Sequence, residues 1–257
     1  MRLDALLVKN GLAQSRERAK NLIKDGGVLI YPVKSAEGGA EQFNRVNGKI
    51  ATKPTQQVDE NSKIEIIKND IPWVSRAGLK LEHALSHWDI NVKNKVCADF
   101  GACTGGFTEV LLENGAEKVY SIDVGSGQLA EKLRSDERVI NMENTHIKNL
   151  SKENFSELLD FICIDVSFIS LSHILPKAAE LVSAEGEIVT LIKPQFEVGK
   201  KNIKKGIVKE ENLHEEVIEK IKKLSEDLGF EILGITDSPI LGGKGNKEFL
   251  IRLRKGS

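Results

Sequence analysis

The sequence contains few cysteines, and they form no recognisable motif. Its 257 residues include only Cys97, Cys103 and Cys163, an odd number without C-x-x-C spacing. A disulfide framework is therefore not expected, and reduced, mostly buried thiols are typical of cytoplasmic proteins. We predict a cytoplasmic protein without a bound metal.

Long apolar runs are also missing. No stretch approaches the roughly 20 residues that a helix needs to span a bilayer, and no signal peptide opens the chain. Export, pore formation and membrane contact are therefore not expected. A hydrophobic content of 40% with 29% charged residues indicates a soluble globular protein with a sizeable core.

A strong net charge is absent too, since the formal charge is −1. The distribution is nevertheless uneven. Residues 1–68 hold 12 Lys/Arg against 8 Asp/Glu, a charge of +4, which leaves −5 for the remainder. A basic front end on an acidic body suggests that the first part meets an anionic partner.

Residues 1–30 have the pattern of two short helices and a strand. Ser15 is suited to cap the second helix. Arg16, Lys20 and Lys24 follow at spacings of four, so they share the face opposite the apolar one. Such a stripe suits a phosphate backbone, although an ordinary solvated face has the same pattern.

The first module ends near residue 68. A polar loop covers residues 31–45, an Asn-Gly pair predicts a hairpin turn, and "KIEIIK" predicts a closing strand. We predict a small α+β domain at 1–68, a linker at 69–73 and a second domain at 74–257.

Alternating strands and helices fill the second domain. This alternation predicts an α/β fold with a parallel, doubly wound sheet. The segment "SPILGGKGN" between the last two strands is too short for a helical crossover, so the final strand should be antiparallel. The predicted strands are 96–100, 118–123, 137–141, 160–165, 187–192, 230–236 and 247–253.

A glycine-rich turn, "DFGACTGGF", follows the first of these strands. Glycines allow a close backbone approach, and the next helix offers free N–H groups to a ligand. Asp123 ends the following strand, where a carboxylate can accept both ribose hydroxyls. Both NAD and S-adenosylmethionine (SAM) are bound in this way.

The details favour SAM. The G-x-G-x-x-G dinucleotide pattern lacks its middle glycine, and Asp99 suits an amino-acid ammonium better than a pyrophosphate. Glu143 and Asn144 follow the third strand, where they could meet the adenine or simply cap a loop. The predicted cofactor-binding residues are Asp99, Gly101, Ala102, Cys103, Thr104, Gly105, Gly106, Phe107, Asp123, Val124, Glu143, Asn144 and Asp165.

Four ionisable residues stand at strand or helix ends. Lys80 lies on the helix before the first strand, Asp165 and Lys193 end the fourth and fifth, and Glu248 starts the last. The carboxyl ends of parallel strands share one rim, and an antiparallel last strand begins there. Two lysines and two carboxylates suit a hydroxyl acceptor: one lysine, with a lowered pKa, would take the proton.

Two other kinds of methyl acceptor are disfavoured. Amino methylation of adenine uses an Asn/Asp-Pro-Pro-aromatic run after the fourth strand, where this chain has "CIDVSF". Methylation of a base carbon needs an activated cysteine. Cys163 lies inside the strand, and the strand end is taken by Asp165.

These motifs resemble known families. Lys80, Asp165, Lys193 and Glu248 match the tetrad of FtsJ/RrmJ-like ribose 2′-O-methyltransferases. "RLDALL", "SRERAKNLIKDGGV" and "VNGK" resemble the S-four-type (alpha-L) RNA-binding domain. Together with "GACTGGFTEVLLENGA" and "KPQFE" they resemble the TlyA/hemolysin A family. The segment Tyr31–Arg45 and Cys103, where serine is common, depart from the family pattern.

The resemblance implies a Rossmann-like SAM-dependent methyltransferase of seven strands behind an alpha-L domain. It implies cytidine 2′-O-methylation of ribosomal RNA in one or both subunits, with no stable protein partner expected. An inactive assembly factor and a methyltransferase of another RNA remain alternatives, and a pore former is disfavoured. Trp73 or Phe196 could stack on a base. The residues expected to bind RNA are Arg2, Arg16, Lys20, Lys24, Lys200 and Lys201.

Overall fold

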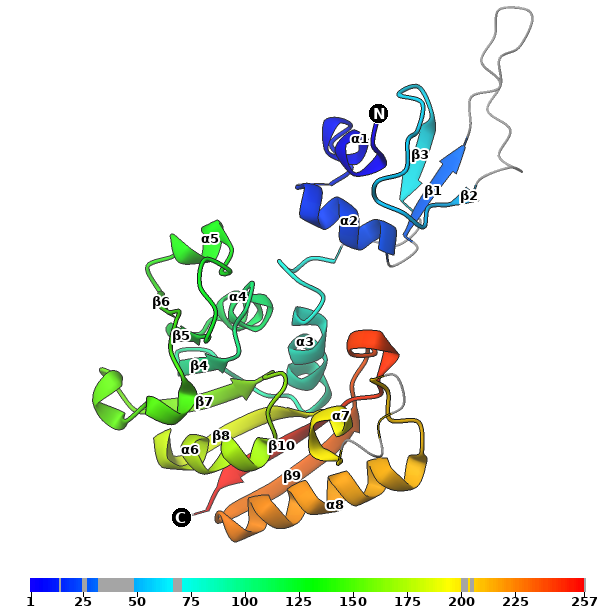
Figure 1. Cartoon of the computed structure of the whole chain (residues 1–257). Coiled ribbons are helices and arrows are strands. Elements are labelled where there is room, and N and C mark those ends of the chain that lie inside the picture. Colours follow the sequence, from blue (N-terminus) through cyan, green and yellow to red (C-terminus); the bar gives the residue numbers. More distant parts are fainter. Residues whose placement is uncertain are drawn as a thin grey trace, which may run out of the picture. The chain divides into compact units, whose positions relative to one another are not determined.

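The computed structural model describes residues 1–13, 15–24, 27–31, 49–66, 71–199, 203 and 206–256. They form two compact units, Met1–Pro72 and Trp73–Ser257 (Figure 1). The predicted loop beyond Tyr31 and the Asn-Gly turn lie outside the described residues. So do Lys200, Lys201 and the side chain of Lys24.

The first unit pairs two helices with a small antiparallel sheet. Its strands lie in the order β2-β1-β3. As predicted, Ser15 caps the second helix: its Oγ accepts from the Arg18 backbone N–H at 3.2 Å. A separate hydrophobic cluster that includes Leu3, Ile23 and Val28 fills this unit. The elements are α1 (Leu3–Lys9), α2 (Arg16–Lys24), β1 (Val28–Tyr31), β2 (Lys49–Ile50) and β3 (Lys63–Ile66).

The second unit is built on a 7-stranded sheet with the order β6-β5-β4-β7-β8-β10-β9. Neighbouring strands from β6 to β8 are parallel, whereas β10 is antiparallel to both β8 and β9. The predicted fold class is confirmed. The strands are β4 (Val96–Phe100), β5 (Lys118–Ile122), β6 (Val139–Met142), β7 (Leu159–Ile164), β8 (Val182–Ile192), β9 (Phe230–Asp237) and β10 (Phe249–Lys255).

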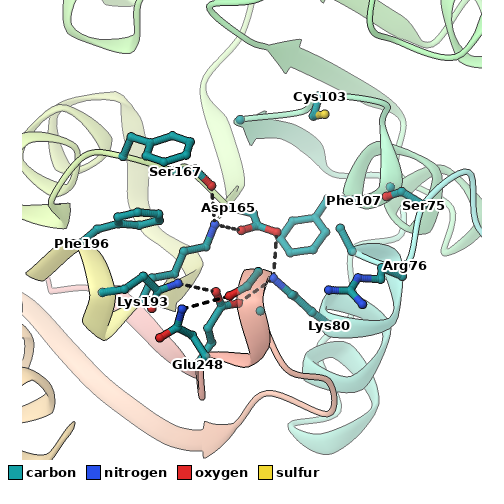
Figure 2. Close-up of a pocket in the computed structure, with 18 of the residues that line it drawn as sticks. Ser75, Arg76, Lys80, Cys103, Phe107, Asp165, Ser167, Lys193, Phe196 and Glu248 are labelled. Carbon is teal, nitrogen blue, oxygen red and sulfur yellow. Dashed lines mark hydrogen bonds and ion pairs between the residues drawn. The ribbon is translucent and has the colours of Figure 1, made fainter. Parts of the chain in front are cut away.

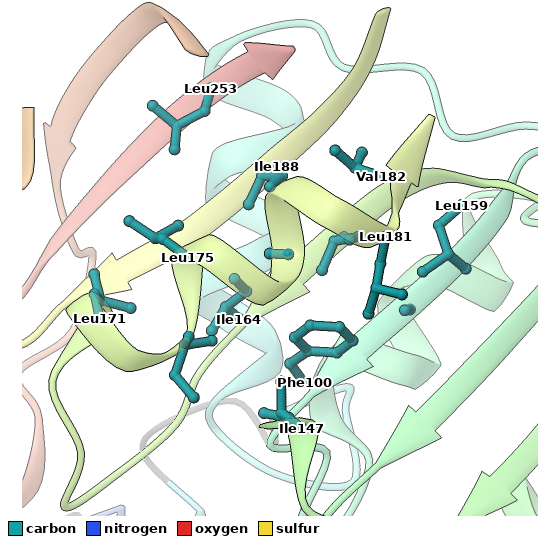
Figure 3. Packing of buried hydrophobic residues seen from close by; sticks show 14 of the residues in the cluster. Phe100, Ile147, Leu159, Ile164, Leu171, Leu175, Leu181, Val182, Ile188 and Leu253 are labelled. Carbon is teal, nitrogen blue, oxygen red and sulfur yellow. The ribbon is translucent and has the colours of Figure 1, made fainter. Parts of the chain in front are cut away.

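Helices cover both faces of this sheet because its central strands are apolar on both sides. In β7, Ile162 and Ile164 face the cluster under α6 and α8, shown in part in Figure 3. Phe161 and Cys163 face the cluster under α3 and α4. The helices are α3 (Gly78–His87), α4 (Gly106–Glu113), α5 (Glu131–Arg134), α6 (Leu175–Leu181), α7 (Pro194–Glu197) and α8 (Glu211–Asp227). Short 3₁₀ turns cover Ile147–Asn149, Lys152–Asn154, Leu171–His173 and Gly243–Gly245.

Most predicted strand boundaries differ from the structure by one or two residues, and the starts of two strands show the cause. The strand predicted at 137–141 begins only at Val139, because the Asp136 side chain accepts from the Arg138 backbone N–H and turns the chain first. The strand predicted at 187–192 already begins at Val182, which pairs with Leu159 directly after α6. Both misses concern ends of elements, where local polar contacts decide the boundary.

Within the described ranges, no helix combines the length and the apolar character needed to cross a membrane.

Candidate active site

The four ionisable residues singled out in the sequence meet in one place. Lys80 lies in the first turn of α3, Asp165 directly follows β7, Lys193 directly follows β8, and Glu248 directly precedes β10. β10 runs against β8, so its start lies beside the end of β8, where Phe249 pairs with Ile192. Figure 2 shows the four side chains pointing toward one another.

Their contacts form a chain of ion pairs. Lys80 Nζ donates to Glu248 Oε2 at 2.9 Å and to Asp165 Oδ2 at 3.3 Å. Lys193 Nζ forms an ion pair with Asp165 Oδ1 at 2.5 Å. All four side chains are at least 88% shielded from solvent. Two ammonium groups thus balance two carboxylates in a buried site.

Charge pairing shifts the pKa values of two of these groups, Lys80 and Asp165. Burial lowers the pKa of Lys80, but the carboxylates of Asp165 and Glu248 outweigh burial and raise this pKa above its ordinary value. Burial likewise raises the pKa of Asp165, and the two lysines reverse the shift, so that the carboxyl has a lowered pKa. Lys80 is therefore not a lysine with the lowered pKa that the sequence analysis expects of one of the two.

Two residues that the sequence analysis missed bind the two end members of this series of ion pairs, Lys193 and Glu248. Ser167 Oγ accepts from Lys193 Nζ at 3.1 Å. Gln195 Nε2 donates to Glu248 Oε1 at 2.9 Å. Both follow a predicted residue by two positions, so their closeness in sequence was the available signal. They orient Lys193 and Glu248 and act as positioning residues.

A cavity of about 540 Å³ opens on the four residues. One side is the glycine turn, and the other is formed by segments after β7 and β8 and before β10. Phe168 stands out on its wall, since it is 90% exposed, has φ +66° and contacts the Phe196 ring at 5.1 Å between centroids. Predicted residues on the wall are Lys80, Asp99, Gly101, Ala102, Cys103, Thr104, Gly106, Phe107, Asp165, Lys193, Phe196 and Glu248.

The glycine turn lies against the carboxyl end of β7. Gly101 has φ +89°, and a Cβ there would lie 2.9 Å from the carbonyl oxygen of Asp165. Only glycine lets the turn approach this closely. The turn and Asp165 thus form one continuous wall of the cavity.

Other predicted cofactor residues, namely Gly105, Asp123, Val124, Glu143 and Asn144, do not line this cavity. Asp123 is bonded to the turn, since Oδ2 accepts from the Cys103 N–H at 2.9 Å and Oδ1 from the Gly125 N–H at 2.7 Å. Glu143 accepts backbone N–H groups of residues 127–129, which lower its pKa to about 2. The structure therefore places these acids on the loops beside the turn.

Comparison with known proteins decides the family. The model of the FtsJ-like methyltransferase family matches residues 73–255, and the S4 domain model matches residues 1–30.

The chain belongs to the FtsJ-like methyltransferase family.

This methyltransferase has relatives of nearly the same length. It is 38% identical to "16S/23S rRNA (cytidine-2'-O)-methyltransferase TlyA" of Mycobacterium tuberculosis, over 98% of this chain and 89% of that protein. It is 40% identical to "Hemolysin A" of Brachyspira hyodysenteriae, over 97% and 98%. A solved structure of a hemolysin-like protein from Streptococcus thermophilus shares 41% identity with a TM-score of 0.77, covering 100% and 89%. The predicted combination of domains and the predicted family are confirmed.

The cavity of this methyltransferase also fits an amino-acid cofactor. Asp99 is 1% exposed, and its Oδ2 accepts from the Thr108 N–H and Oγ1 at 2.9 and 2.8 Å. Oδ1 has no partner in the described part of the chain. Burial raises the pKa of Asp99 to about 7, although the Thr108 hydrogen bonds lower it. An ammonium group at this wall would stabilise the unpaired carboxylate.

The residues expected to bind RNA are only partly described. Arg2 and Arg16 meet at the buried carboxylate of Asp4, with contacts of 2.8 and 3.2 Å. Lys20 pairs with Glu17 at 2.9 Å. All three cations remain partly exposed, between 36% and 56%. The pairing with Asp4 holds two guanidinium groups in fixed positions on this unit.

Proposed function

We propose that this protein is a SAM-dependent ribose 2′-O-methyltransferase that acts on ribosomal RNA, with cytidine as the target nucleoside. The observation that carries the proposal is the buried chain of ion pairs from Glu248 through Lys80 and Asp165 to Lys193, inside one cavity with the glycine turn. The name of the Mycobacterium tuberculosis relative supports the substrate. A Campylobacter jejuni relative, 36% identical, is named for 23S rRNA alone, so either or both subunits are candidates.

SAM, when bound, supplies a methyl group on a positively charged sulfur. Asp99 would hold its ammonium group, because the carboxylate has an unpartnered oxygen at the cavity wall. The backbone of Gly101, Ala102 and Cys103 would form the floor beneath it. Asp123 would accept ribose hydroxyls in place of its present backbone donors, and Glu143 and Asn144 would meet the adenine.

In this proposal the four ionisable residues activate the ribose hydroxyl. Lys193 faces one carboxylate, and Lys80 faces two, so Lys80 is held more firmly as an ammonium. We assign Lys193 as the base: after its ammonium has released a proton to solvent, the neutral amine takes the proton of the hydroxyl. Lys80 stays protonated and is the fixed cation that stabilises the developing oxyanion. Asp165 positions both lysines. Glu248 keeps Lys80 protonated, because its carboxylate offsets the effect of burial, which alone would favour the neutral amine.

Phe168 and Phe196 would receive the base of the target nucleotide. Phe168 is 90% exposed at the cavity wall and has a φ of +66°, a backbone conformation that bulky residues rarely adopt. RNA bases stack on such rings once they leave the helix. Trp73, the other aromatic suggested by the sequence, donates from Nε1 to Glu82 at 3.2 Å and packs against the α3 side of the core.

The first unit would grip the RNA backbone. Arg2, Arg16 and Lys20 present partly exposed cations, and such contacts position a nucleic acid without reading its sequence. Lys24, Lys200 and Lys201 stay predictions from the sequence. A ribosomal substrate would place the reaction in the cytoplasm.

The test uses purified ribosomal subunits from a strain that lacks the enzyme, with isotope-labelled SAM. We expect label on a ribose oxygen of ribosomal RNA, located by mass spectrometry of nuclease fragments. Lys193→Ala should lower the rate by about 10²–10⁴-fold, as for loss of a general base. Lys222→Ala, an exposed lysine on α8 paired with Glu219, is the matched control.

Two outcomes would contradict the proposal. Transfer by the wild type to RNA other than ribosomal RNA would change the substrate. SAM binding without transfer to any RNA would leave an RNA-binding assembly factor with an inactive methyltransferase fold.

A further inference from the structure

The loop between β9 and β10 forms part of the cavity wall, and the function proposed above leaves it without a role. Gly242, Gly243, Lys244 and Asn246 line the cavity. The loop ends two residues before Glu248. An inference about this loop rests on the proposed function, since it concerns the same RNA substrate.

The loop is held from two sides. Asn246 is 2% exposed, and its Nδ2 donates to the carbonyls of Gly206 and Gly243 at 2.8 and 2.9 Å. Its Oδ1 accepts from the Val208 N–H at 3.1 Å. At the other end, Arg76 Nη2 donates to the carbonyl of Leu241 at 3.3 Å. Because every amide atom of Asn246 is bonded, the loop is positioned before any ligand arrives.

The loop also contacts the catalytic chain of ion pairs. A Cβ at Gly242 would lie 1.9 Å from Glu248 Oε1, so only glycine leaves room for this carboxylate. A group bound by the loop therefore lies close to the atoms that activate the hydroxyl.

Lys244 gives the loop its charge. Its backbone is left-handed, with φ +60°, and its side chain lies against Gly206. It has no carboxylate partner in the described part of the chain, whereas Lys247, three residues on, pairs with Asp237 at 3.0 Å. The four catalytic residues are formally neutral together. Lys244 thus adds a cation at the cavity mouth that those residues do not balance.

We propose that residues 241–246 form the subsite for a backbone phosphate of the target nucleotide, with Lys244 as its cation. A ribose 2′-hydroxyl in RNA always lies next to a 3′-phosphodiester, so an anion accompanies the reacting oxygen. The fixed loop places a cation for that anion, and the phosphate in turn fixes the ribose above Lys80 and Lys193. Asn246 is the positioning residue of the subsite.

The experiment compares Lys244→Met and Lys244→Arg with Lys247→Met, the matched control in the same segment. Binding to ribosomal subunits and transfer from SAM are measured between 50 and 300 mM salt. For Lys244→Met we expect roughly tenfold weaker subunit binding and a salt slope reduced by about 1, the change for loss of one phosphate contact. Because the phosphate also fixes the ribose, the KM for subunits should rise and kcat should fall, while SAM affinity should stay unchanged. Lys244→Arg should restore most of the binding, and Lys247→Met should resemble the wild type.

An unchanged salt slope in Lys244→Met, or an equal loss in Lys247→Met, would overturn the phosphate subsite while leaving the proposed function intact. Absence of transfer by the wild type would instead refute the proposed function, and the subsite would fall with it.

Discussion

Lys80 and Lys193 differ in the number of carboxylates that they face, and this difference separates their roles. Lys80 contacts both Asp165 and Glu248, whereas Lys193 contacts Asp165 and the neutral hydroxyl of Ser167. A second carboxylate stabilises the protonated form of Lys80. The sequence shows two residues of the same type at this site, and only the partners seen in the structure distinguish them.

Asp99 predicts a pH dependence of cofactor binding. Its pKa is about 7 because burial disfavours the carboxylate. An ammonium ligand prefers the ionised form, so binding should release a proton and SAM affinity should rise with pH. Below pH 7 we expect a fall of up to about tenfold per pH unit, with a plateau above about pH 8. Isothermal calorimetry in buffers of different ionisation enthalpy would measure both affinity and proton release.

Two variants control this prediction. Asp99→Asn should bind SAM weakly with little pH dependence. Thr108→Val removes a hydrogen bond that lowers the pKa of Asp99, so the rise should move to higher pH. A wild-type affinity that is flat from pH 6 to pH 8 would contradict the role of Asp99.

At the scale of elements, the antiparallel β10 is what completes the site. A parallel last strand would have placed its start at the opposite edge of the sheet, away from Asp165 and Lys193. The short connection between β9 and β10 already indicated the reversal in the sequence. The paired register of Phe249 with Ile192 then brings Glu248 beside Lys193.

The two helices of the first unit are joined through Asp4, which gives a second prediction. Asp4 lies on α1, is fully buried and accepts from Arg2 and from Arg16 on α2. These contacts lower the pKa of Asp4 to about 2, and the hydrogen bond from Arg2 contributes more than that from Arg16. Asp4→Asn should lower the stability of this unit by about 1 kcal/mol and weaken RNA binding more than the loss of one surface charge would. Urea unfolding followed by circular dichroism measures the first effect, and binding to ribosomal subunits the second.

The sign of the acid effect follows from the lowered pKa. Since the unfolded carboxyl has an ordinary pKa of 3.8, the stabilisation by Asp4 is fully present above that value and is lost as pH falls through about 2. Asp4→Asn should therefore remove part of the acid sensitivity of the first unit. Equal acid sensitivity of variant and wild type would assign that sensitivity to other carboxyls.

At the scale of the whole molecule, each unit has its own hydrophobic core. Leu3, Ile23 and Val28 belong to a cluster separate from the two that cover the large sheet. We predict two thermal transitions for the full chain in differential scanning calorimetry. Saturating SAM at about 100 times its Kd should stabilise the larger unit by about 2.7 kcal/mol and leave the other transition in place. A single transition that shifts as a whole with SAM would show that the two units unfold together.

The sequence by itself determined the succession of strands and helices, the glycine turn, the reversed last strand and the four ionisable residues of the site. These depend on local periodicity and on the rule that parallel strands end at one edge, which need no coordinates. The strand starts at residues 139 and 182 were predicted wrongly. The first is set by one side-chain hydrogen bond of Asp136, and the second by the pairing of Val182 with Leu159.

The tertiary structure decided the pairings and the surface. Lys80 meets its partners across 85 and 168 residues of chain, and such distances leave no periodic trace in the sequence. The same holds for the contact of Gly242 with Glu248, the exposure of Phe168 and the bonds that fix Asn246. Local pattern places a side chain at an edge, but its neighbours, and therefore its protonation and role, depend on how distant segments pack.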